Sequence, residues 1–216
     1  MKRFIAVLAV VALTGTLVTV NAEEFQYGVR ANFNFNFFSI DEYDSDEGAG
    51  FGAGLALKYY LMEELAMAPE ISFGYRNLGG FSYRTPLIGR GNASYREMVV
   101  SIPILAQYHL HKVIPTDVIP SDKLFAVGGV QLDIPFGTKT KGTNSLGIKF
   151  DEKINSDHRS VVDFSLAFGM GYVVAPNLSG DLRLVQSLHK PLTASGLISE
   201  FKASFTSLAL GVTYLL

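Results

Sequence analysis

The sequence contains no cysteine and no tryptophan, and it is poor in charged residues. Without cysteine the chain cannot form a disulfide, a thiolate or a cysteine-ligated zinc site. Charged residues make up 18% of the chain, compared with about a quarter in typical soluble domains. The chain therefore has no covalent cross-link to stabilise it, and its low charge is unusual for a soluble domain.

Long apolar runs are also missing after the N-terminal region. Hydrophobic residues make up 48% of the chain, yet they are interrupted every few positions. A membrane-spanning helix needs about 20 consecutive apolar residues. If this chain crosses a bilayer, it must do so as a closed sheet, because only a closed sheet then leaves no backbone group unpaired in hydrocarbon.

The N-terminus has the three parts of a secretory signal. Lys2-Arg3 precedes an apolar stretch, and small residues suitable for cleavage end at Ala22. We expect residues 1–22 to be a cleaved signal peptide and residues 23–216 to be one exported domain, with a retained membrane anchor as the alternative. An exported chain without disulfides needs another source of stability, and a closed hydrogen-bonded sheet provides one.

Charge then limits the partners of the mature chain. Cleavage removes two of the 18 basic residues and none of the 20 acidic residues, so 16 basic residues remain and the net charge is −4. This balance argues against nucleic acid as a partner.

Apolar residues alternate with small or charged residues along most of the chain. The even positions of one segment are all large and apolar: Val162, Phe164, Leu166, Phe168, Met170, Tyr172 and Val174. This period of two is typical of a β-strand with one apolar face. Eight such segments occur, at roughly 25–37, 50–61, 65–77, 94–110, 123–136, 159–174, 178–189 and 200–216. Each is long enough for a tilted membrane strand of about 9–11 residues.

The second face of these strands favours a membrane barrel over a soluble sheet. In a soluble barrel or sandwich, the second face would be rich in Lys, Glu and Thr. Here it is rich in Gly, Ala and Ser, as in 50–61, and small residues suit the narrow lumen of an eight-stranded barrel. We therefore predict an all-β fold, an eight-stranded antiparallel up-and-down transmembrane β-barrel that is a monomer in the cell outer membrane.

Tyrosines and loop lengths predict the orientation of this barrel. Five tyrosines share the outward register at the edge where both termini lie: Tyr27, Tyr59, Tyr108, Tyr172 and Tyr214. They resemble an interfacial aromatic girdle. We expect short periplasmic turns at 62–64 and 175–177, and longer external connections at 38–49, 78–93, 137–158 and 190–199. The segment 111–122 is long for a periplasmic turn.

The alternation places nine charged residues inside the barrel. They are Arg30, Lys58, Arg76, Arg183, Glu70, Glu97, Asp133, Asp163 and Asp181. Opposite charges enclosed in a narrow lumen should pair, so we expect a salt-bridged structural plug. A proton or ion path is the alternative.

Other polar clusters give weaker indications. The acidic loop 41–47 could bind calcium through its carboxylates, or it could be a solvated surface loop. His158 and His189 lie near Ser156, Ser160 and Ser187 towards the external side, but no catalytic spacing appears. We therefore expect no catalytic residues, no cofactor-binding residues and no metal ligands.

Two prolines interrupt the predicted strands. Proline cannot donate a hydrogen bond to a sheet ladder. If Asn77 pairs with Ser94, Pro69 lies opposite Ile102 and beside Pro103. This juxtaposition predicts either a bulge or a weak seam that could open laterally for a lipid chain.

Three parts of the chain resemble the PorT-like outer-membrane β-barrel family. They are Val100–Tyr108, then Asp163-Phe164 with Gly169–Tyr172, and Asp181–Arg183. In the first, Ser101 and Gln107 replace an acidic and a basic residue of the family pattern. The resemblance implies an eight-stranded barrel similar to OmpX and the membrane domain of OmpA. Some relatives act in secretion and gliding.

Together these features predict a protein without catalytic activity or a wide pore. Its external loops would bind envelope or extracellular proteins, and its outer wall would contact outer-membrane lipids. Two alternatives are a lipid-modifying enzyme at the outer rim and a narrow passage for small solutes or lipids.

Overall fold

The computed structural model describes residues 25–40, 47–85, 89–112, 123–143, 149–153, 162–189, 192–194 and 201–216. Almost all of them lie in antiparallel strands, as the alternation predicted. Among these residues there is no helix long and apolar enough to cross a membrane. The predicted signal peptide (1–22) lies outside the described residues.

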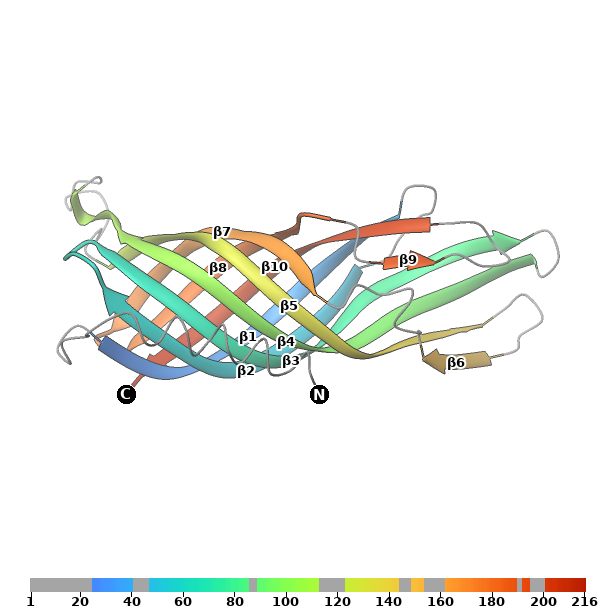
Figure 1. The fold of residues 1–216 in the computed structure, drawn as a ribbon, viewed down its shortest axis with the longest axis horizontal. Coiled ribbons are helices and arrows are strands. Elements are labelled where there is room, and N and C mark those ends of the chain that lie inside the picture. The colour runs from blue at the N-terminus through green and yellow to red at the C-terminus, as the bar shows by residue number, and fades with distance from the viewer. Residues whose placement is uncertain are drawn as a thin grey trace.

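Eight long strands close into a barrel (Figure 1). They are β1 (Phe25–Ile40), β2 (Glu47–Tyr60), β3 (Leu65–Thr85), β4 (Gly89–His109), β5 (Leu124–Thr143), β7 (Asp163–Ala175), β8 (Leu178–Ser187) and β10 (Phe201–Leu215). Each pairs with the next, and β10 pairs with β1 to complete the ring. The short strands β6 (Lys149–Lys153) and β9 (Leu192–Ala194) pair with β5 and β10, and a single 3₁₀ turn, η2 (Leu110–Lys112), follows β4. The predicted eight-stranded barrel is confirmed.

Side chains alternate across the barrel wall as predicted. On β7, Leu166 and Phe168 are exposed on the outside, whereas Ser165 and Ala167 are buried inside. A soluble protein would bury the large apolar set. Here the exposed apolar residues form the outer surface of a closed sheet, which is the arrangement of a transmembrane barrel.

The start of β1, the end of β10 and the short turns lie at the same end of the barrel (Figure 1). The backbone amide of Leu215 donates to Asn177 in the β7–β8 turn, and that of Leu216 donates to Tyr27 at the start of β1. Short turns face the periplasm in outer-membrane barrels, which makes this the periplasmic end. The five girdle tyrosines all belong to the residue pairs nearest this end of the strand ladders. Tyr27 and Tyr214 are well exposed.

At the other end, β3, β4 and β5 continue beyond the rest of the barrel, and β6 pairs with β5 there (Figure 1). The predicted long connections at 78–93 and 137–158 are therefore wrong in part, because both hold paired strands. Gly79 and Gly137 lie where these two predicted loops begin, but each adopts a positive φ at a β-bulge, where the register shifts and the strand continues.

The predicted pairing of β3 with β4 is displaced by two residues. Asn77 pairs with Arg96 rather than Ser94, so Pro69 lies opposite Ile104, still beside Pro103. The predicted register assumed that the chain turns at 78–93, but β3 continues to Thr85 and β4 begins at Gly89. The predicted loop was therefore the wrong reference for pairing the two strands.

The ladder between these strands is interrupted beside the prolines. Pairing stops after Pro69 and Ile104 and resumes at Ser72 and Ser101. The register is the same on both sides of the gap, so the predicted bulge at this point is wrong. Lateral opening at the gap stays a prediction.

Candidate functional site

The lumen is the candidate functional site, because the inward faces of the strands gather nearly all the buried charge there. All nine charged residues predicted to point inward are buried. Eight of them form two salt-bridged clusters, which confirms the predicted pairing. The ninth, Lys58, lies near the periplasmic end with its Nζ 3.4 Å from His109 Nε2 and 4.8 Å from the centre of the Tyr60 ring.

The inner cluster joins two arginines with two carboxylates. Arg30 donates to both oxygens of Asp181, at 2.5 and 2.8 Å, and Arg183 donates to both oxygens of Glu70, at 2.9 and 2.8 Å. Arg30 Nε also lies 3.2 Å from Glu70 Oε2. These bidentate contacts are the strongest geometry available to such pairs, and the four charges balance.

A glycine makes room for the inner cluster. A Cβ added to Gly211 would overlap the Arg30 guanidinium. The guanidinium therefore occupies the space that any larger residue at this position would fill, and the position of Arg30 depends on the missing side chain.

The outer cluster surrounds one arginine with three carboxylates. Arg76 donates to Glu97 Oε1 at 2.9 and 2.6 Å and to Asp133 Oδ2 at 3.1 Å, and Asp163 Oδ2 lies 3.5 Å from its Nη2. The Arg76 guanidinium also lies over the ring of Phe205, 4.5 Å from its centre. This cluster joins β3, β4, β5 and β7 across the lumen.

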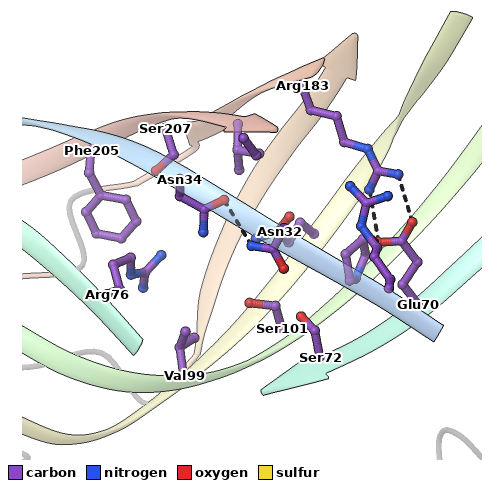
Figure 2. A pocket seen from close by; sticks show the side chains of 15 residues that line it. Asn32, Asn34, Glu70, Ser72, Arg76, Val99, Ser101, Arg183, Phe205 and Ser207 are labelled. Carbon is purple, nitrogen blue, oxygen red and sulfur yellow. Dashed lines mark hydrogen bonds and ion pairs between the residues drawn. The ribbon is translucent and has the colours of Figure 1, made fainter. Parts of the chain in front are cut away.

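A small polar cavity lies between the clusters (Figure 2). Uncharged polar residues form part of its lining, including Asn32, Asn34, Ser72, Ser101 and Gln131. The side-chain amide of Asn32 donates to Asn34 Oδ1 at 3.0 Å. The volume open to the centres of water molecules is about 60 Å³, enough for about four waters. The cavity can hold water between the ion pairs, but it is too small for a larger solute.

The lumen also contains an apolar cluster that charge-based reasoning missed. It consists of Ala68, Leu105, Phe125, Val127, Ala167 and Val185. Phe125 is only 1% exposed and lies near the periplasmic end, where its ring occupies the space over Gly171. The sequence did contain a sign of this cluster. The alternation in 123–136 places Phe125 on the lumen side, where most other residues of the predicted strands are small or polar.

The structure does not assemble a catalytic triad from Ser187, His189 and Asp163. The Ser187 hydroxyl donates to the backbone carbonyl of His189 at 2.6 Å, not to its ring. His189 Nε2 lies 3.8 Å from Asp163 Oδ1, and that carboxylate contacts Arg76. A nucleophile needs a base within hydrogen-bonding reach, and this arrangement does not provide one.

Several sequence predictions fall outside the described residues. They concern His158, Ser156, Ser160 and the acidic loop at positions 41–46. Within the described ranges, no group of three or more His, Asp or Glu residues could hold a metal ion.

Comparison with known families identifies the barrel. The family model described as outer membrane protein beta-barrel domain matches residues 20–192, about four-fifths of the chain. The chain belongs to this family. It is therefore a transmembrane β-barrel of the outer membrane, as its strand number, closed ring and apolar exterior also indicate.

Solved structures show similarity at low sequence identity. Neisserial surface protein A of Neisseria is 15% identical, with 87% of this chain and 96% of that chain covered and a TM-score of 0.42. Ail of Yersinia pestis is 12% identical, with coverage of 89% and 99% and a TM-score of 0.43. OprG of Pseudomonas aeruginosa is 13% identical, with coverage of 88% and 95% and a TM-score of 0.45. No curated protein sequence matches the chain. The family assignment rests on the family model alone.

Proposed function

We propose that this barrel is a non-catalytic structural and interaction protein that passes no solute through its lumen. The buried ion pairs support this proposal most directly. Arg30, Arg76 and Arg183 each contact two or more carboxylates, and together they join strands on opposite sides of the ring. Removing one partner from a buried pair costs about 3–5 kcal/mol, so the resting lumen stays closed.

The external strands supply the interaction surface in this proposal. β3, β4 and β5 extend past the barrel, and their paired backbone presents a sheet outside the membrane (Figure 1). Envelope or extracellular proteins are the partners we propose for it, and the barrel itself would act as a monomer. Kinship with the PorT-like branch and cleavage of the signal peptide after Ala22 belong to the same proposal.

Conductance tests the closed lumen. The mature barrel inserted into a planar bilayer should remain silent, whereas a general porin added to the same bilayer shows that the assay detects pores. Steady unitary currents from the wild-type barrel would contradict the proposal.

Crosslinking in intact cells tests the interaction role. A photoreactive residue at Thr143, which is exposed on the external part of β5, should form adducts with a discrete protein. The matched control is Ser72, which lines the lumen cavity and should form none. Absence of any adduct at Thr143 and at other external positions would remove the interaction proposal.

The interrupted β3–β4 ladder favours a second candidate, lateral passage of a lipid chain. Two rungs are missing between Pro69 and Ser72, which weakens this seam relative to the continuous ladder of β1 with β2. Amide hydrogen exchange should then be faster at Glu70, Ile71, Ile102 and Ile104 than in the continuous ladder of β1 with β2. Equal protection would eliminate lateral opening.

Catalysis at the outer rim is the third hypothesis, and no contact among the described residues favours it. Comparing the lipids of cells with and without the protein would test it. A modified lipid that requires the protein would overturn the non-catalytic proposal.

A further inference from the structure

The external sheet has cations gathered on one face. Arg96 lies on β4, Lys139 and Lys141 lie on β5, and Lys149 lies on β6. Lys139 is the partner of Arg96 in one ladder, and Lys149 is the partner of Thr143, four residues beyond Lys139, in the next. Residues opposite one another or two apart along a strand share a face. These four residues therefore form one surface, which we call the basic face.

The basic face is on the outer side of the barrel wall. Glu97 and Thr138 point into the lumen, where the Thr138 hydroxyl donates to Glu97 Oε2 at 3.4 Å. Their neighbours Arg96 and Lys139 therefore point away from the lumen. Lys139, Lys141 and Lys149 are exposed and Arg96 is half-buried.

The basic face continues directly from the lipid-contacting surface. Met98 and Phe136 pair across β4 and β5, and both are exposed on the outer wall. Arg96 and Lys139 follow them two or three residues farther from the periplasm, a distance of roughly 7–10 Å along a strand. The headgroup region on each side of the hydrocarbon core is about 5–8 Å thick. The cations thus begin at the depth of lipid phosphates.

Within the part of the chain that the structure describes, most of this positive charge has no compensating carboxylate. Lys141 pairs with Asp151 at 3.0 Å. Arg96, Lys139 and Lys149 form no ion pair with any described residue, and Arg96 Nε has no hydrogen-bond partner within the described ranges. Arg96 and Lys139 are direct partners in the β4–β5 ladder, so two cationic residues lie opposite each other on this face. Like charges placed directly opposite each other destabilise a sheet unless an anion lies between them.

We propose that the basic face binds the phosphate groups of anionic lipids in the outer leaflet. Three arguments favour a lipid over a soluble polyanion: the face is continuous with the lipid-contacting wall, it begins at phosphate depth with Arg96 and Lys139, and its charge is complementary. The inference concerns the outer wall and is independent of whether the lumen conducts.

Retention of lipid A tests the proposal. The mature barrel would be reconstituted in phosphatidylcholine bilayers containing bisphosphorylated lipid A, and the lipid A retained after extraction into neutral detergent would be quantified by native mass spectrometry. The test variant is Lys139→Gln/Lys149→Gln. Each cation beside an anionic lipid surface contributes about fivefold to affinity, so the double variant should retain lipid A about 25-fold more weakly.

Controls separate charge at this face from charge in general. Thr143→Gln changes an uncharged residue of the same face, and Lys123→Gln removes a cation at the periplasmic end. Both should retain lipid A as the wild type does, and so should Lys139→Arg. In phosphatidylcholine alone, the double variant should unfold at the wild-type temperature or above, because Lys139→Gln removes the like-charge contact with Arg96.

Three results would overturn the proposal. One is equal retention of bisphosphorylated and dephosphorylated lipid A by the wild type. A second is unchanged retention by a folded double variant. The third is binding of soluble heparin that requires Lys139 and Lys149 without any preference for phosphorylated lipid, which would assign the basic face to a soluble polyanion.

Discussion

Replacing Glu70 by Gln should destabilise the barrel strongly. Glu70 accepts two hydrogen bonds from Arg183, at 2.9 and 2.8 Å, and its Oε2 lies 3.2 Å from Arg30 Nε. Its side chain is 5% exposed, so little water can solvate the arginines that lose their partner. The inner cluster would keep two guanidinium groups and one carboxylate, that of Asp181.

The expected loss follows from this buried charge. Removing one partner of a buried pair costs about 3–5 kcal/mol. The glutamine amide still offers one acceptor oxygen, which places Glu70→Gln at the low end of that range, about 3 kcal/mol. Adding Arg183→Met removes the excess charge and leaves the neutral pair of Arg30 with Asp181, so the double variant should cost less than the sum of the two single substitutions.

Denaturant unfolding in lipid vesicles measures these values. Circular dichroism is the suitable signal because the chain has no tryptophan. Ser72→Ala is the matched control, since Ser72 lies two residues along β3 and lines the same lumen. A loss below about 1 kcal/mol for Glu70→Gln, or additive effects in the double variant, would refute the inference that these ion pairs are coupled and buried.

Two further substitutions test the wall of the barrel. Gly211→Ala should cost about 1–3 kcal/mol in unfolding free energy, because its Cβ would displace the Arg30 guanidinium, whereas Gly180→Ala would meet only a backbone oxygen at 3.7 Å and should change little. Leu166→Arg should cost about 2–4 kcal/mol near the bilayer midplane, whereas Ser165→Ala changes only the lumen and should stay within about 1 kcal/mol. Equal losses within either pair would contradict the assigned positions.

Side-chain direction could be predicted from the sequence residue by residue. Successive side chains of a strand point to opposite faces. Once the large apolar residues are assigned to the outside, the charged residues between them must point inward, from Arg30 in β1 to Arg183 in β8. The girdle tyrosines followed from the same parity. These predictions needed only local alternation and the even number of strands.

The partners of the charged residues could not be predicted in this way. Arg30 meets Asp181, 151 positions along the chain, and the two belong to β1 and β8, which are separated by β10. Contacts across a lumen depend on strand tilt and stagger, which alternation does not encode. The sequence therefore predicted that charges pair but not which charges do so.

The external sheet was missed for a related reason. Gly79 and Gly137 separate the predicted membrane strands from what looked like loops. Glycine at positive φ serves both turns and bulges, and a single sequence does not distinguish the two. The basic face became visible only when the register placed Arg96 beside Lys139.

The most direct measurement asks which face of the sheet contacts acyl chains. Because the chain has no cysteine, single cysteines at Ile71, Ser72 and Phe73 can each carry the only thiol-reactive fluorophore. Ile71 and Phe73 are exposed on the outer wall, whereas Ser72, which lies between them in the sequence, lines the lumen cavity. In bilayers with brominated acyl chains, we predict strong quenching at positions 71 and 73 and weak quenching at 72. Strong quenching at 72 alone, or equal quenching at all three positions, would contradict a barrel with its apolar face in lipid and its ion pairs enclosed.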